Sequence, residues 1–207
     1  MTEVKICGIT DPETGLFAAE EGARFIGLIF DPLSARTVSV ERARKIVSAL
    51  AKTEAIPVGV FTARCVTDLV SIVCTTEVGA VQLHGKEVQE VSRTLPEALI
   101  RFYVLRVTQG GEVLDRPPHF ADKKRDFLLY DGVIPGTGKA FDRSRFRPDR
   151  SFRFFLAGGL SPDNVREAVF VLKPTGVDVA TGVEDGNTGR KDRTLIRLFI
   201  RRAREVA

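Results

Sequence analysis

The sequence predicts an α/β fold, namely a closed (β/α)8 (TIM) barrel in a single domain over residues 1–207. Three observations support this prediction. Short apolar, β-rich runs recur, helical patterns lie between most of them, and no linker or change in composition divides the chain. A doubly wound open sheet is the main alternative. Eight regular strand-and-helix units in about 200 residues favour a barrel, at the short end of its size range.

The expected strands are short runs rich in β-branched and aromatic residues. They cover residues 4–6, 25–30, 57–61, 80–83, 102–106, 127–130, 154–156 and 177–179. The expected helices cover residues 12–22, 40–52, 64–76, 87–94, 162–173 and 189–205. The stretches 112–124 and 142–148 have weaker helical patterns, and we expect short or irregular structure there.

Helix start signals support several of these boundaries. Thr10 or Asp11 can cap the first helix, with Pro12 in its first turn. Ser39 can cap the second helix. Ser161 followed directly by a proline is typical of an N-cap with proline at the first helical position.

Composition and charge limit the classes of function. The net charge of +4 is a mild excess that suits an anionic small-molecule substrate and gives little indication of nucleic-acid binding. No apolar run approaches the ~20 residues of a membrane span, and no basic leader precedes an apolar segment, so we expect a cytoplasmic protein. Three cysteines without zinc-motif spacing and two histidines argue against disulfides and metal.

A barrel of this kind places its chemistry where strands end and the following loops begin. Polar, reactive and glycine residues gather at those positions in this sequence. They are Cys7, Arg36, His84, Asp131, Gly158, Gly159, Asp178, Thr181 and Gly182.

Two glycine-containing loops predict a phosphate site. Gly158 and Gly159 follow the seventh expected strand, and Thr181 and Gly182 follow the eighth. Residues without a Cβ let backbone amides approach an anion closely, and phosphate sites after strands seven and eight are frequent in these barrels. A Gly-Gly pair alone can simply form a tight turn, so the prediction depends on the pairing of the two loops.

Cys7 and Asp131 are candidates for acid–base chemistry. Lys5 lies two residues before Cys7, on the same strand face, where its ammonium would favour the thiolate. The alternatives are that Cys7 is a small buried hydrophobe and that Lys5 belongs to an ion pair inside the barrel. Asp131 follows an apolar run that could raise its pKa, although aspartate before glycine is also common in turns.

Arg36 and His84 have weaker signals when each is considered alone. The guanidinium of Arg36 can bind a carboxylate of a substrate in bidentate fashion, or pair with a neighbouring loop. A single histidine such as His84 is more often packed or hydrogen-bonded than catalytic.

The segments KICGIT, VGVF, VQLHG, LLYDGVIPGTGKAFD, LAGGLSPDNV and GVDVATGVEDGNTGRKD closely resemble, in that order, the signature blocks of phosphoribosylanthranilate isomerases. The resemblance covers essentially the whole chain. It implies a (β/α)8 barrel that acts in tryptophan biosynthesis without metal or organic cofactor. The implied reaction is the Amadori rearrangement of N-(5-phosphoribosyl)anthranilate to 1-(2-carboxyphenylamino)-1-deoxyribulose 5-phosphate.

The resemblance also implies a role for each candidate residue. Cys7 matches the general base that removes the proton from C2 of the ribose, and Asp131 matches the general acid that protonates the ring oxygen. Arg36 matches the residue that faces the anthranilate carboxylate. His84, within VQLHG, and Asp178 match substrate-side residues. The phosphate loops match Gly158, Gly159, Thr181 and Gly182.

The sequence departs from the family pattern in places and leaves alternatives open. The usual Ser-Pro-Arg reads Ser34-Ala35-Arg36, and the usual double serine reads Ala180-Thr181. A metal-dependent epimerase on the same barrel would need more histidine and carboxylate ligands. A non-catalytic metabolite-binding paralogue could discard the acid and the base, yet both candidates are present. The sequence does not distinguish a monomer from a homodimer.

Overall fold

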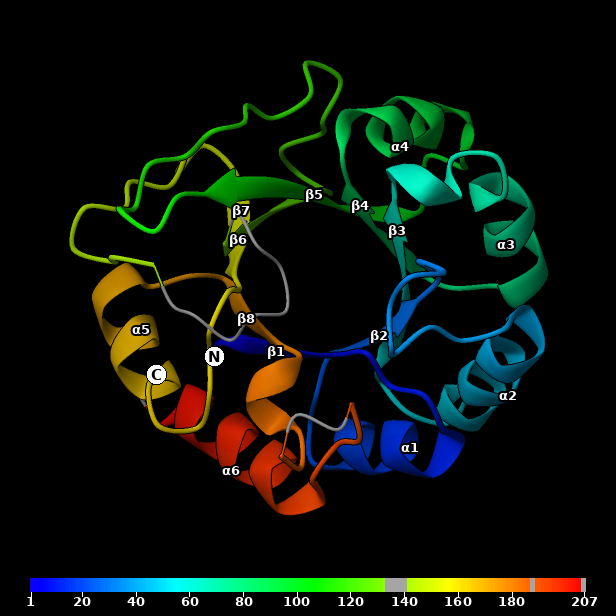
Figure 1. Cartoon of the computed structure of the whole chain (residues 1–207), viewed down its shortest axis with the longest axis horizontal. Coiled ribbons are helices and arrows are strands. Elements are labelled where there is room, and N and C mark those ends of the chain that lie inside the picture. The colour runs from blue at the N-terminus through cyan, green and yellow to red at the C-terminus, as the bar shows by residue number, and fades with distance from the viewer. Residues whose placement is uncertain (133–140, 187–188, 206–207) are drawn as a thin grey trace.

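The computed structural model describes residues 1–132, 141–186 and 189–205, and shows eight parallel strands closed into a barrel, with β1 pairing with β8. Figure 1 looks down this barrel, with the helices on its outer side. The predicted barrel is thus confirmed over the open sheet. The strands are β1 (Glu3–Cys7), β2 (Phe25–Ile29), β3 (Ile56–Thr62), β4 (Ala80–His84), β5 (Ile100–Val107), β6 (Phe127–Gly132), β7 (Arg153–Leu156) and β8 (Gly176–Val179).

The helices follow most of the strands. They are α1 (Pro12–Glu20), α2 (Val40–Leu50), α3 (Leu69–Thr76), α4 (Lys86–Val91), α5 (Val165–Leu172) and α6 (Arg193–Arg204), with 3₁₀ turns at Ala63–Cys65, Ser92–Thr94 and Thr181–Val183. Across the described residues, no helix is both long and apolar enough to cross a membrane.

The helix caps agree with the sequence at two positions and differ at a third. The side chain of Asp11 accepts a hydrogen bond from the Thr14 amide, and that of Ser39 accepts one from the Arg42 amide, so both caps are confirmed. Ser161 is not an N-cap, because α5 begins only at Val165. The Asn164 side chain accepts from the Ser161 amide at 3.0 Å, which closes a separate turn before the helix.

Two of the expected eight strand-and-helix units lack a helix within the described residues 108–126 and 141–152. Figure 1 shows irregular chain where helices would cover β5, β6 and β7. The first of these segments contains Pro117 and Pro118, which have no amide proton to donate to a helical hydrogen bond. The expectation of eight regular units was therefore wrong, whereas irregular structure in the weak stretches is confirmed.

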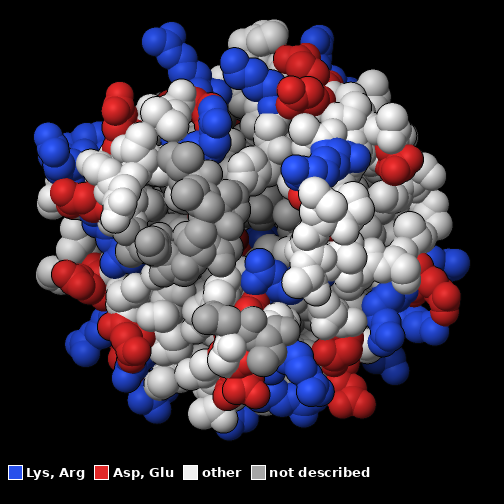
Figure 2. All heavy atoms as spheres, viewed as in Figure 1, with Lys and Arg blue, Asp and Glu red and all other residues white. Residues whose placement is uncertain are grey.

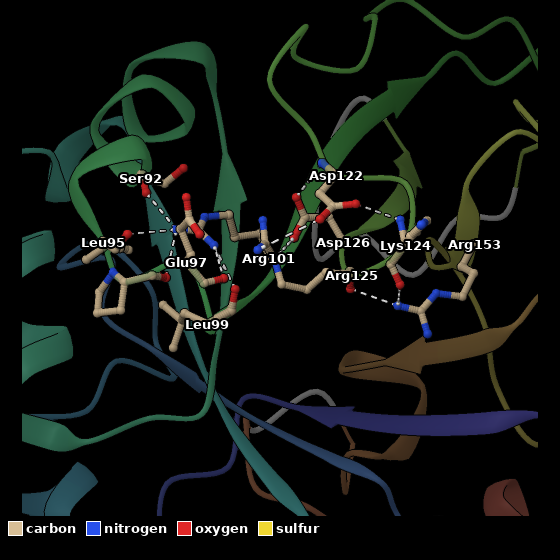
Figure 3. A network of polar contacts seen from close by, with 11 residues as sticks. Ser92, Leu95, Glu97, Leu99, Arg101, Asp122, Lys124, Arg125, Asp126 and Arg153 are labelled. Carbon is tan, nitrogen blue, oxygen red and sulfur yellow. Dashed lines mark hydrogen bonds and ion pairs between the residues drawn. The ribbon is translucent and has the colours of Figure 1, made fainter.

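Side-chain contacts hold the first irregular segment in place. Arg153, at the start of β7, donates to the carbonyls of Lys124 and Arg125 at 2.8 Å (Figure 3). Its guanidinium also lies over the ring of Phe127. The buried carboxylate of Asp126 accepts from the Asp122 amide at 2.9 Å. These contacts replace the backbone ladder that a helix would provide.

A second arginine binds the chain that leads into β5. The side chain of Arg101 is buried, and its guanidinium donates only to main-chain carbonyls (Figure 3). The accepting carbonyls belong to Ser92, Leu95, Pro96, Glu97 and Leu99.

Four phenylalanine rings fill one layer of the barrel interior. Phe25, Phe102, Phe127 and Phe155 are buried, and their ring centroids lie 4.9–6.1 Å apart, mostly edge to face. Gly176 on β8 is required beside them, because a Cβ there would collide with the Phe155 ring. The rings make this end of the barrel a packed core rather than a channel.

Lys5 and Asp178 form an ion pair deep inside the barrel. The Lys5 ammonium is fully buried and lies 2.9 Å from the Asp178 carboxylate, and the two residues are direct register partners on β1 and β8. The alternative of an ion pair inside the barrel is thus the correct one for Lys5. Gly27 on β2 leaves the space that the Lys5 ammonium and the Cys7 sulfur occupy.

We predict that Lys5→Met destabilises the fold by about 3–5 kcal/mol, because it leaves the Asp178 carboxylate buried without its cation. The midpoint of urea unfolding measures this effect. Lys45→Met is the control, since Lys45 forms an exposed ion pair with Glu41 and its loss should change little. The double variant Lys5→Met/Asp178→Leu should recover most of the lost stability. If Lys5→Met and the control Lys45→Met were equally stable, the prediction would be contradicted.

Candidate active site

A cavity opens at the carboxyl ends of β6, β7 and β8, where a barrel presents its chemistry. It brings together six of the nine residues that the sequence singled out. Figure 2 shows a hollow near the centre of this face, with basic and acidic atoms inside it. The cavity is lined by Asp131, Ala157, Gly158, Gly159, Leu160, Asp178, Val179, Ala180, Thr181 and Gly182.

The loop after β7 has the form of an anion site. Gly158 and Gly159 have φ angles of 77° and 64°, which favour glycine. Among the described residues no acceptor takes a hydrogen bond from either amide, so both can donate to a ligand. Asn164 donates to the Gly159 carbonyl at 2.8 Å and fixes the direction of this peptide. Consecutive amides in such a turn form a concavity that suits phosphate.

The loop after β8 packs directly on the loop after β7. A Cβ at Gly182 would collide with the Leu160 carbonyl, and a Cβ at Gly158 would lie 2.9 Å from the Gly132 amide nitrogen. Gly182 and Gly158 are therefore needed where they stand, whether or not they touch a ligand. The pairing of the two loops, on which the phosphate prediction depends, is present in the structure.

The carboxyl group of Asp131 is held in a state that suits a proton donor. It stands at the end of β6 and accepts a hydrogen bond from the Gly132 amide at 2.8 Å. Burial and the nearby carboxylate of Asp178 raise its pKa to about 6, while the Gly132 amide and Lys5 act in the opposite direction. The expected upward shift is thus found, with a second cause in Asp178 that the sequence does not reveal.

Cys7 lies beside the cavity at the end of β1. It is buried, with 5% of its surface exposed, and packs with Ile29 and Val60, with Ala180 against this group. Burial raises the pKa of its thiol above the ordinary value, and Lys5 lowers it without cancelling that effect. Lys5 thus favours the thiolate, as expected, but burial outweighs its effect on the thiol pKa.

The side chain of Arg36 reaches from the loop after β2 to the loop after β8. Its side chain lies over Gly8, where a Cβ would come 2.7 Å from the Arg36 Cδ. Its Nη1 donates to the Glu184 carboxylate at 2.5 Å and to the Thr181 hydroxyl at 3.3 Å. Glu184 also accepts from Lys191 at 3.1 Å. Arg36 thus pairs with a neighbouring loop, which was one of its two expected roles, and lies over Gly8, the residue after Cys7.

His84 occupies the end of β4 and is not among the residues that line the cavity. It is half-buried, and burial lowers the pKa of its imidazole, with a further contribution from Arg106. His84 is therefore neutral near pH 7 and able to accept or donate one hydrogen bond at the mouth.

Sequence reasoning gave no role to three residues that organise this site, namely Glu184, Lys191 and Asn164. They lie in segments that the resemblance includes, but spacing gives no sign of their contacts. Lys191 pairs with Glu184 in an isolated antiparallel β-bridge, and this pairing cannot be read from the sequence. Over the described ranges, no three His, Cys, Asp or Glu side chains come together in a way that could hold a metal ion.

Comparison with known proteins places this site in a family. The family model described as N-(5'phosphoribosyl)anthranilate (PRA) isomerase matches residues 4–202. The N-(5'-phosphoribosyl)anthranilate isomerase of Chlamydia felis is 39% identical over 98% of this chain and 97% of its own length. The isomerase of Thermotoga maritima is also 39% identical, over 99% of each chain.

Solved structures agree with the sequence comparison. Phosphoribosyl anthranilate isomerase from Thermus thermophilus matches with a TM-score of 0.78 and 31% identity over 100% of both chains. A phosphoribosyl anthranilate isomerase in complex with reduced 1-(o-carboxyphenylamino)-1-deoxyribulose 5-phosphate matches with a TM-score of 0.74 and 33% identity over 98% of both chains. With its cavity of paired glycine loops and an elevated carboxyl pKa, this chain belongs to the N-(5'-phosphoribosyl)anthranilate isomerase family, the intramolecular isomerases of tryptophan biosynthesis.

Proposed function

We propose that this protein converts N-(5-phosphoribosyl)anthranilate to 1-(2-carboxyphenylamino)-1-deoxyribulose 5-phosphate, with Cys7 as general base and Asp131 as general acid. The observation that carries the proposal is the juxtaposition at one barrel mouth. A buried carboxyl of raised pKa and two unpaired glycine amides line a single cavity, and a thiol lies beside it. The reaction is an isomerisation that consists of proton transfers and one C–O cleavage without net oxidation or reduction, so the proposal includes no metal or organic cofactor.

The phosphate of the substrate is the anchor in this proposal. Gly158 and Gly159 line the cavity, no described acceptor takes a hydrogen bond from their amides, and the residues Thr181 and Gly182 of the next loop line the same cavity. Backbone amides can bind phosphate without the entropic cost of ordering a flexible side chain. The carboxylate of the anthranilate ring would then reach Arg36, whose guanidinium carries more donors than its bonds to Glu184 and Thr181 use.

Proton transfers by Asp131 and Cys7 carry the chemistry in this proposal. The carboxyl group of Asp131 gives its proton to the ribose ring oxygen, so the C1–O bond breaks and a protonated imine forms. The thiolate of Cys7 then takes the proton from C2, which gives a neutral enolamine. The enolamine becomes the ketone when C1 gains a proton from solvent and the C2 hydroxyl releases one to solvent. The Cys7 thiol then gives up its proton and the Asp131 carboxylate regains one, so the protons balance over the cycle. Asp131 must begin protonated and Cys7 deprotonated, which explains why the acid needs a raised pKa.

We predict that Cys7→Ser and Asp131→Asn each lower kcat by about 10²-fold or more, since general acid–base catalysis supplies about 10²–10⁴-fold. A serine hydroxyl does not ionise near neutral pH, and an asparagine has no acidic proton. Steady-state turnover of phosphoribosylanthranilate measures the loss, with circular dichroism to check folding. Cys74→Ser, at an exposed thiol, is the control and should keep full activity. Either active-site variant retaining a third of kcat would overturn the mechanism.

Asp131→Asn should also stabilise the protein at pH 8 and have no such effect at pH 4. The pKa of Asp131 is raised to about 6 in the folded state, so the carboxyl favours folding below its unfolded pKa and loses that contribution as the pH rises through about 6. Removing the charge should recover about 3 kcal/mol at pH 8, or about 6–12 °C in Tm.

Thermal unfolding at the two pH values tests this prediction. Asp142→Asn is the matched control, because Ser144 lowers the pKa of that exposed carboxyl and its loss should not stabilise at either pH. A gain at pH 4 as large as at pH 8 would show that the effect does not come from ionisation of Asp131.

Gly159→Asn should raise KM for phosphoribosylanthranilate at least tenfold with little change in Tm. Asparagine tolerates the positive φ of Gly159, so its side chain obstructs the phosphate site without much backbone strain. Gly186→Asn is the matched control, since Gly186 also has a positive φ and has open space around it. An unchanged KM in Gly159→Asn would place the phosphate elsewhere.

A further inference from the structure

Lys191 is a buried cation whose role the proposed mechanism does not explain. Only 2% of its side-chain surface is exposed, and its ammonium donates to the Ala180 carbonyl at 2.9 Å and to the Glu184 carboxylate at 3.1 Å. Burying an ammonium is costly, so its position calls for a compensating function.

The contacts of Lys191 lead to Cys7 from two sides. Ala180, whose carbonyl Lys191 holds, packs against the group formed by Cys7, Ile29 and Val60. Glu184, the other partner of Lys191, holds Arg36, and Arg36 lies over Gly8, next to Cys7 in the chain. Lys191 therefore fixes Ala180, which packs beside the thiol, and, through Glu184, Arg36, which lies over Gly8.

The net positive charge near the thiol does not come from Lys5, although the sequence suggested Lys5 as its source. Lys5 is paired with Asp178, so this pair contributes no net charge. Arg36, Lys191 and Glu184 together carry two positive charges and one negative charge, which leaves a net charge of +1. We define these three residues as the basic triad.

Within the part of the chain that the structure describes, Lys5 and Lys191 are the cations that act on the Cys7 thiol. β2 and β3 contribute Gly27, Ile29 and Val60, which carry no charge. His84 and Arg106 stand at the ends of β4 and β5, and Arg106 is paired with Asp115. The charged groups that act on the thiol are Lys5, Asp178 and Lys191, and these are in turn linked to Asp131, Glu184 and Arg36.

We propose that Lys191 is a positioning residue of the isomerase, which holds Glu184 and the Ala180 carbonyl in place and gives the basic triad the net positive charge that stabilises the Cys7 thiolate. Its catalytic consequence rests on the proposed function of Cys7 as general base. Its effect on the thiol does not, and can be measured without substrate. Lys191 opposes the effect of burial on the pKa of Cys7, in agreement with this role.

The test is a titration of the Cys7 thiolate by its ultraviolet absorbance. Subtracting the curve of the matched Cys7→Ala variant removes the contributions of Cys65 and Cys74. The two tyrosines do not interfere in the neutral and mildly alkaline range, because burial raises the pKa of Tyr103 and of Tyr130 to about 12.

Two substitutions should shift this titration in opposite directions. Lys191→Met removes a positive charge and should raise the midpoint by about one pH unit or more, whereas Glu184→Gln removes the negative charge of the triad and should lower it. Lys191→Arg keeps the charge and should restore most of the midpoint. Lys45→Met, on the outer face of α2, is the control and should leave it unchanged.

Opposite shifts support the proposal, whereas equal midpoints or shifts in the same direction overturn it, because a merely structural role would loosen the site similarly in both variants. Should Lys191→Met fail to fold, Glu184→Gln decides alone, since only the charge effect predicts a lower midpoint.

Steady-state turnover of phosphoribosylanthranilate by the same variants separates the two proposals. Lys191→Met should lower kcat/KM at neutral pH about tenfold, with Lys191→Arg closer to the parent, because less thiolate is present. If the thiolate midpoints of Lys191→Met and Glu184→Gln shifted in opposite directions while the parent protein showed no turnover, the role of Lys191 would stand and the proposed function would be refuted. Turnover in the parent with an unmoved thiol midpoint would refute the role of Lys191 alone.

Discussion

The buried ion pair of Lys5 and Asp178 is the interaction on which the rest of the site depends. It joins β1 to β8 across the seam where the barrel closes, so the first and last strands are fixed in register by charge as well as by backbone bonds. A buried pair of this kind adds little net stability, but removing one partner is costly, and its value lies in fixing geometry. Cys7 lies two residues beyond Lys5, and Asp178 acts on the pKa of Asp131.

Much of the fold could be predicted, because its strands have local signals. Apolar runs predicted all eight strands, and Asp11 and Ser39 marked two helix starts. The missing helices beside β5, β6 and β7 could not be predicted, since contacts such as those from Arg153, far along the chain, to Lys124 and Arg125 take the place of a helical ladder. Ser161 was misleading for a similar reason, because Asn164 uses its side chain to close a turn there.

The candidate site was predictable where it depends on strand ends, and not where it depends on charge pairing. Parallel strands must end at one face, so Asp131 and the glycine loops could be placed together from sequence. The state of Cys7 could not, because burial raises the pKa of its thiol and Asp178, 173 positions from Lys5 in the chain, pairs with the nearest ammonium. The contribution of Lys191 to the charge near the thiol depends in turn on the β-bridge that pairs Lys191 with Glu184.

The irregular segment between β5 and β6 has a consequence for the order in which the chain folds. A helix can form from its own residues as soon as they are synthesised, whereas the stretch at Lys124 and Arg125 takes its main-chain partners from Arg153 on β7. The contacts that tie Lys124 and Arg125 to the barrel wall can therefore form only once β7 is in place. The helices that precede this segment close their hydrogen bonds within their own residues, so their hydrogen bonds do not depend on a later strand in this way.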